Sequence, residues 1–177
     1  MQLQIAVTYS EDILGRLARW WGMTWTHVGL RYRREAPGSG WRVIEATMTG
    51  IKDSSWQEFI AGSEEHQLYR VRGGLSEAKE REIVAFGWGN VGKRYAFWWI
   101  AKLAWRLLKQ RFPLGPLTYP SHVCSSLVAN CFLYAGINLV PAEAGVLVTP
   151  DEVVGSALLE KVPPGAAAAA VAGIARG

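Results

Sequence analysis

Two short segments in which apolar and polar residues alternate place the strongest constraint on how this chain can fold. In residues 26–33, THVGLRYR, the side chains of Val28, Leu30 and Tyr32 would lie on one face of a strand and that of His27 on the other. The turn-forming sequence APGSG follows, and then the second segment, WRVIEAT, at residues 41–47. Two alternating runs joined by such a turn predict a β-hairpin.

The rest of the chain is predicted to form short elements in mixed order. Alternation predicts strands at 3–8, 66–72 and in VLVT at 146–149, and helical spacing predicts helices at 13–21, 75–86, 95–112 and 121–135. A short helix within 51–60 is expected to begin near Ser54 or Ser55, and Ser76 and Thr149 are expected to cap two further helices. We expect one domain over residues 1–163, followed by an Ala- and Gly-rich tail at 164–177.

Charge and composition argue against several classes of protein. The net charge of +4 reflects 19 basic and 15 acidic side chains without blocks of one sign, so nucleic acid is not the expected partner. No apolar run reaches the ~20 residues of a membrane span, because Lys102 and Arg106 interrupt the longest one. The N-terminus lacks the pattern of a signal peptide, so synthesis in the cytoplasm is expected.

Cys124 is the strongest candidate for a nucleophile. It falls in the first turn of the 121–135 helix, on an apolar stripe with Leu127, Val128 and Cys131. Unpaired backbone N–H groups and the helix dipole stabilise a thiolate at this end, and the same N–H groups can bind an oxyanion. Taken alone, Cys124 is equally compatible with a buried, inert thiol. Cys131 lies two turns further along the helix, where a small core hydrophobe is expected. The α-carbons of the two cysteines would be roughly 10 Å apart, which is too far for a disulfide.

His27 is the strongest of three candidate bases. It shares a strand face with Gly29, which would leave room for a substrate or a helix end to approach. His122 is two residues from Cys124, so their side chains would point apart on a helix. His66 lies in an acidic stretch that is typical of a solvated loop. A half-buried strand histidine without a catalytic role is the alternative for His27.

Glu45 lies on the partner strand of the predicted hairpin and could hold the His27 imidazole in one tautomer and orientation. We expect the two residues to pair directly, which centres the turn near Ala36. A slip of one residue would send Glu45 to the other face of the sheet.

Five segments also match a known family in their order along the chain. They are THVGL at 26–30, VIEATMTGI at 43–51, GKRYAF at 92–97, HVCSSLVANCFLYAGI at 122–137 and VTPDEVVGSALLEKV at 148–162. This pattern resembles the circularly permuted branch of the NlpC-type papain-like cysteine hydrolases, to which lecithin:retinol acyltransferase-like proteins are related. The resemblance implies an α+β, papain-like fold in which an antiparallel sheet packs against helices and the nucleophile lies at a helix N-terminus.

The same resemblance implies roles for individual residues. Cys124 would be the nucleophile, His27 the general base and Glu45 the orienting carboxylate, without a metal or other cofactor. Tyr95 and Ser125 would lie near the oxyanion or substrate. Two departures, Ser126 where the family often has an acidic residue and Ala96 where it has an aspartate, affect the expected substrate cleft and not the triad.

Residues 13–30 also resemble members of this branch from tailed phages and prophages, for which a cell-wall role is the usual inference. We therefore expect an amidase or peptidase that acts on peptidoglycan and is packaged in a virion or delivered to the cell wall. One alternative is a lipid-directed acyltransferase or thioesterase that contacts a membrane surface through the Trp-rich helix 95–112. Another is a non-catalytic virion or assembly component that docks on a protein partner through this helix and the tail.

Overall fold

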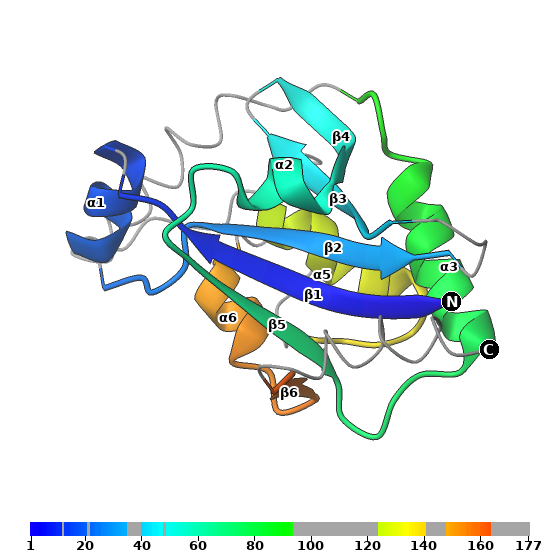
Figure 1. The fold of residues 1–177 in the computed structure, drawn as a ribbon. Coiled ribbons are helices and arrows are strands. Elements are labelled where there is room, and N and C mark those ends of the chain that lie inside the picture. Colours follow the sequence, from blue (N-terminus) through cyan, green and yellow to red (C-terminus); the bar gives the residue numbers. More distant parts are fainter. Residues whose placement is uncertain are drawn as a thin grey trace, which may run out of the picture.

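The computed structural model describes residues 1–11, 13–20, 22–34, 40–47, 49–93, 124–140 and 148–163. Six strands form one sheet in the order β4-β3-β2-β1-β5-β6, and each neighbouring pair is antiparallel (Figure 1). The strands are β1 (Gln2–Tyr9), β2 (His27–Arg33), β3 (Arg42–Thr47), β4 (Gly50–Ser55), β5 (Glu65–Val71) and β6 (Leu159–Lys161). The described helices are α1 (Ile13–Trp20), α2 (Trp56–Ile60), α3 (Glu77–Trp88), α5 (Cys124–Tyr134) and α6 (Pro150–Val154).

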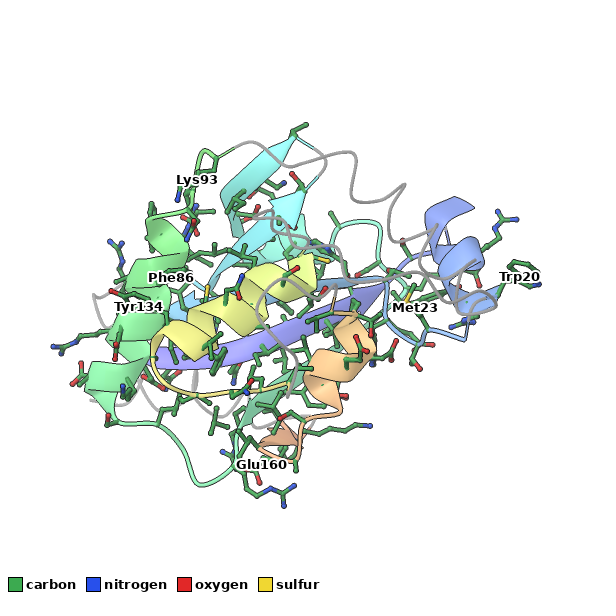
Figure 2. All side chains as sticks on the ribbon, turned by 180° about the vertical axis from the view of Figure 1, so that it is seen from behind. Trp20, Met23, Phe86, Lys93, Tyr134 and Glu160 are labelled. Carbon is green, nitrogen blue, oxygen red and sulfur yellow. The ribbon has the colours of Figure 1, made fainter. Side chains whose placement is uncertain are left out.

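The two faces of the sheet carry two separate apolar clusters. Val28, Leu30 and Tyr32 of β2 lie in the larger cluster, as their alternation predicts, together with residues of α3, α5 and α6. On the opposite face, Phe59 of α2 packs against Val43 in a smaller cluster. Figure 2 shows α5 lying between α3 and α6 over the larger cluster, with Phe86 and Tyr134 at the contact between α3 and α5. The sheet is therefore covered by helices on both faces.

The predicted hairpin forms, but its register differs from the expected one. Glu45 pairs with Gly29 and not with His27, so the expectation of a direct pair was wrong by two residues. The side-chain direction along a strand repeats every two residues, so this shift keeps Glu45 on the face that carries His27. The two side chains consequently meet on a diagonal between neighbouring strands.

Local hydrogen bonds confirm the predicted helix ends. The hydroxyls of Ser55, Ser76 and Thr149 each accept a bond from the backbone N–H three residues later, at the starts of α2, α3 and α6. Gly136 follows the end of α5 with a φ of +78°, a conformation in which a residue with a side chain would be strained. Short-range chemistry thus determines where these helices begin and end.

Other predictions were wrong or fall outside the described residues. Residues 50–55, for which no strand was predicted, form β4 because they pair with β3, and β6 was not predicted either. Trp20, at the end of the predicted helix 13–21, has 78% of its surface exposed. The predicted helix 95–112, residues 146 and 147 of the strand-like segment 146–149, and the tail 164–177 lie outside the described residues. No described helix is long and apolar enough to cross a membrane.

Candidate active site

Cys124 is the first residue of α5, the position that the sequence predicted for it. The helix is held on the sheet by Leu127, Val128 and Cys131, which are fully buried in the larger cluster. Cys124 lies at the edge of this cluster and is partly exposed. The packing of α5 therefore fixes the position of Cys124 in the first turn of this helix.

His27 is the first residue of β2 and contacts groups from both faces of the sheet. Its Nε2 atom lies 2.7 Å from Oε2 of Glu45, and its ring centroid is 5.4 Å from that of Phe59 on the α2 side. The imidazole also forms a hydrogen bond with the side chain of Cys124, whose helix packs on the other side. Because Glu45 occupies Nε2, the nitrogen that remains for Cys124 is Nδ1. The strand end thus brings together the three residues predicted as a triad.

The carboxylate of Glu45 is held by two further side chains. Its Oε1 atom accepts a hydrogen bond of 2.6 Å from the hydroxyl of Ser54 and lies 3.4 Å from Nζ of Lys52. Only 5% of the Glu45 side chain is exposed, against 26% for His27. Sequence reasoning missed Ser54 and Lys52 as neighbours of the site because it did not predict β4, the strand that carries both.

The electrostatics of the three groups favour an ion pair. Burial disfavours the charged form of His27, but its hydrogen bonds with Cys124 and Glu45, and the charges of both, raise its pKa to about 10. Burial would also raise the pKa of the Cys124 thiol. The bond with His27, the positive charge of that ring and the backbone N–H groups of Val28 and Ser125 outweigh burial and lower this pKa below its usual range. Both shifts favour a thiolate beside an imidazolium over the neutral pair.

Glu45 is ionised for a related reason. Burial would raise its pKa, yet the hydrogen bonds from His27 and Ser54, with the charges of His27 and Lys52, lower it below the ordinary value. A carboxylate with one oxygen on His27 and the other on Ser54 has little rotational freedom. It can hold the imidazole plane in one orientation, which is the role expected of the third member of such a triad.

The other residues predicted for the site are placed differently. Ser125 is buried and its hydroxyl donates to the backbone carbonyl of Val148, so its side chain is committed to a structural contact. Gly29 leaves no room for a substrate, because a Cβ atom there would lie 2.8 Å from Phe59 and 2.4 Å from Val43. The expectation of room for a substrate was wrong, whereas the other expected neighbour, a helix, does approach Gly29 through Phe59 of α2. Tyr95 lies outside the described residues.

The remaining cysteine and histidines are separated from this arrangement. Cys131 is fully buried, and burial raises its pKa to about 12, as befits a core thiol. His66 is exposed, as its acidic surroundings predict, but it lies within β5, which agrees with the strand predicted at 66–72 and not with a loop, and it meets the edge of the Trp56 ring. His122 lies outside the described residues. Among the residues that the structure describes, no group of three or more His, Cys, Asp or Glu side chains is arranged to hold a metal ion.

Comparisons with known proteins place this chain in a family. The family model for the permuted papain-like amidase enzymes, YaeF/YiiX, C92 family, matches residues 5–144. Among solved structures, the fold is similar to that of the metalloprotein yiiX from Escherichia coli O157:H7, with a TM-score of 0.69 and 17% identity over 90% of this chain and 94% of that one. No curated protein matches the chain. Because the family model covers most of the sequence, the chain belongs to the permuted papain-like amidase family of YaeF and YiiX.

Proposed function

We propose that this chain is a cysteine-dependent amidase in which Cys124, His27 and Glu45 act as a triad on peptide or amide bonds of peptidoglycan. The observation that carries the proposal is the position of the His27 ring, which contacts the carboxylate of Glu45 through Nε2 and the side chain of Cys124 at the start of α5. Membership of an amidase family supports the class of reaction.

In the first half of the reaction, the Cys124 thiolate attacks the carbonyl carbon of the substrate and forms a C–S bond. The developing oxyanion accepts hydrogen bonds from backbone N–H groups at the start of α5, and we propose Tyr95 as a further donor. The protonated His27 ring then gives its proton to the amide nitrogen, the C–N bond breaks and an amine leaves. The acyl group remains on sulfur as a thioester.

In the second half, water resolves the thioester. His27, now neutral, takes a proton from the water molecule as it attacks the acyl carbon, and the C–S bond breaks to regenerate the thiolate. The products are a carboxylic acid and an enzyme whose imidazolium again faces the thiolate. Glu45 supports both halves because its charge stabilises the positive ring each time His27 is protonated. Every proton in this sequence moves between His27, water and the substrate.

Purified sacculi provide the direct test of this proposal. The wild-type protein should release new amino groups, whereas Cys124→Ala and His27→Ala should reduce the release by about a thousandfold or more. Cys131→Ala and His66→Ala are matched controls, since each removes the same side-chain type at a position without a proposed role. Amine release that persists in Cys124→Ala with an intact fold would overturn the proposal. Mass analysis of the released fragments identifies the bond that is cut.

A phage or prophage origin and an NlpC-type relationship stay predictions from residues 13–30 and from the motif order. The lipid-directed alternative and the proposed docking on a virion partner depended on helix 95–112 and the tail, which lie outside the described residues. Flotation with anionic liposomes separates the first alternative from the amidase proposal. Binding to liposomes without amine release from sacculi would favour a lipid substrate.

A further inference from the structure

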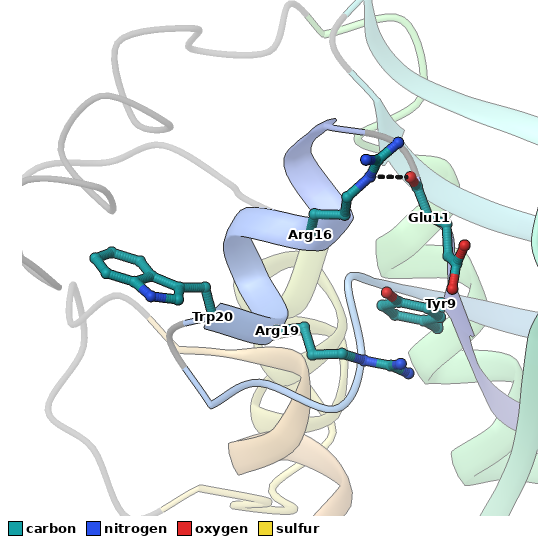
Figure 3. A pocket seen from close by; sticks show the side chains of 5 residues that line it. All are labelled: Tyr9, Glu11, Arg16, Arg19 and Trp20. Atoms are coloured by element: carbon teal, nitrogen blue, oxygen red, sulfur yellow. Dashed lines mark hydrogen bonds between the residues drawn. The ribbon is translucent and has the colours of Figure 1, made fainter.

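A pocket of about 440 Å³ opens on the surface between α1 and the end of β1 (Figure 3). It is lined by Tyr9, Glu11, Arg16, Arg19 and Trp20. In Figure 3 the two arginine side chains extend from α1 toward Tyr9 and Glu11, whereas Trp20 points away from them. The pocket therefore presents two guanidinium groups, of which that of Arg19 lies over the ring of Tyr9.

The pocket lies at the same end of the sheet as the proposed triad. Tyr9 ends β1, and its neighbours Thr8 and Ser10 both hydrogen-bond to Thr26, the residue immediately before His27. Thr8 is also the register partner of His27. Tyr9 follows Val7 by two residues, so it lies on the sheet face that α5 covers. A substrate bound at Cys124 thus has this pocket within reach along the end of the sheet.

Both guanidinium groups are oriented by contacts that leave donors available. The Arg19 guanidinium stacks on the Tyr9 ring, with its central carbon 3.9 Å from the ring centroid. Its N–H groups lie in the plane of the guanidinium, so stacking leaves them available as donors. The Nε atom of Arg16 donates to the backbone carbonyl of Glu11 over 3.0 Å. Two guanidinium groups held in this way can each donate paired hydrogen bonds to a carboxylate, which they bind better than a neutral group.

The acidic residue of the pocket limits the charge of its ligand. Among the described residues that line the pocket, Glu11 carries the carboxyl group. Its one negative charge lies against the two positive charges of Arg16 and Arg19. The remaining excess of about one positive charge suits a monoanion.

We infer that this pocket is a substrate subsite that binds a free carboxylate of the peptide cleaved at Cys124. The inference rests on the proposed amidase function and names a substrate class for it: acyl peptides with a terminal or side-chain carboxylate near the scissile bond. A dianionic phosphate group carries more charge than this excess and is repelled by the carboxylate of Glu11, and a neutral carboxamide leaves the guanidinium groups without a charged partner.

Matched peptides test the inference. We would compare two stem tetrapeptides that differ only in a C-terminal carboxylate or carboxamide. The wild-type kcat/KM should favour the carboxylate by about tenfold, the size of one exposed charge-assisted contact pair. Arg16→Gln and Arg19→Gln should each lose most of this preference through a higher KM on the carboxylate alone. Arg70→Gln, which removes an exposed arginine of β5 that pairs with Glu160, is the control and should keep the preference.

A binding measurement separates this inference from the amidase proposal. Calorimetry on the Cys124→Ala protein with the same two peptides and with a phosphonate analogue needs no turnover. Selective binding of the carboxylate, lost in the Arg16→Gln background, supports the subsite even if the wild-type protein cleaves neither peptide. Equal binding of carboxylate and carboxamide, tighter binding of the phosphonate, or equal effects of the arginine variants on both peptides would overturn it, whether or not cleavage occurs.

Discussion

Ser54 donates a hydrogen bond of 2.6 Å to the oxygen of Glu45 that faces away from His27. This contact links β4 to the proposed triad through β3. Ser54 is buried, as is the carboxylate that it contacts, so solvent does not compete strongly for either group. The hydroxyl therefore positions the carboxylate and helps to keep it ionised.

Ser54→Ala should lower kcat/KM by about tenfold, because it removes a buried hydrogen bond to a charged group. The Ser54 bond lowers the pKa of Glu45, so its loss should also move the acidic limb of the pH–rate profile to higher pH. Ser54→Thr keeps the hydroxyl and should restore the profile. Ser63→Ala is the control, since Ser63 bonds only to the carbonyl of Ile60 among the described residues. A loss of rate without a shift of the acidic limb would indicate a purely structural role.

Glu45→Gln keeps the shape of the side chain but removes its charge, so it should lower kcat/KM by about a hundredfold or more. Without this charge the pKa of His27 falls from its raised value of about 10, and the imidazolium loses a stabilising partner. Glu160→Gln is the control: it removes the charge of a β6 residue that pairs with Arg70 of β5, and it should leave the rate unchanged. Activity of Glu45→Gln close to that of the wild type would contradict the orienting role.

The same variant predicts how stability depends on pH. Folding lowers the pKa of Glu45 below its ordinary value of 4.5, so the folded state binds this proton less tightly than the unfolded state does. The contribution of Glu45 to the free energy of unfolding is therefore present above about pH 4.5 and is lost as the pH falls through the lowered value. Urea unfolding should show that the difference between wild type and Glu45→Gln shrinks from pH 7 toward pH 3. A difference that grows in acid would contradict this sign.

Gly29→Ala should destabilise the fold by about 1–3 kcal/mol, the usual range for overpacking a core. The new Cβ atom would lie 2.4 Å from Cγ1 of Val43 and 2.8 Å from the ring of Phe59, which also contacts His27. Displacing Phe59 should therefore reduce activity as well. Gly40→Ala is a matched control, because a Cβ atom there meets nothing within 4 Å. Equal unfolding midpoints in urea for the two variants would contradict this prediction, because Phe59 and Val43 would then move aside without a loss of stability.

Much of the fold could be predicted because local chemistry determines it. Alternation placed Val28, Leu30 and Tyr32 in the core, and side-chain oxygens at Ser76 and Thr149 marked the starts of helices. These features depend on neighbours within a few residues along the chain. The position of Cys124 at the start of α5 could be read in the same way, from helical spacing alone.

Features that depend on pairing between distant segments could not be predicted. The sequence of β4, GIKDSS, has little strand character, and only its pairing with β3 makes it a strand. For that reason Ser54 was considered only as a helix cap, and its contact with Glu45 was missed. The register of the hairpin was also misjudged by two residues, since it depends on the turn as well as on alternation. The face of Glu45 was nevertheless right, because two residues are one full strand repeat.

The pKa of the Cys124 thiol tests the central claim most directly. It is measured from the rate of alkylation by iodoacetamide between pH 4 and pH 11, with Cys131 as a buried thiol that should not react in the folded protein. We predict a titration below the ordinary cysteine value of 9.0 in the wild type. In His27→Asn, where the imidazolium is absent, the titration should move upward. An ordinary thiol pKa in the wild type, unchanged by the loss of His27, would contradict the account.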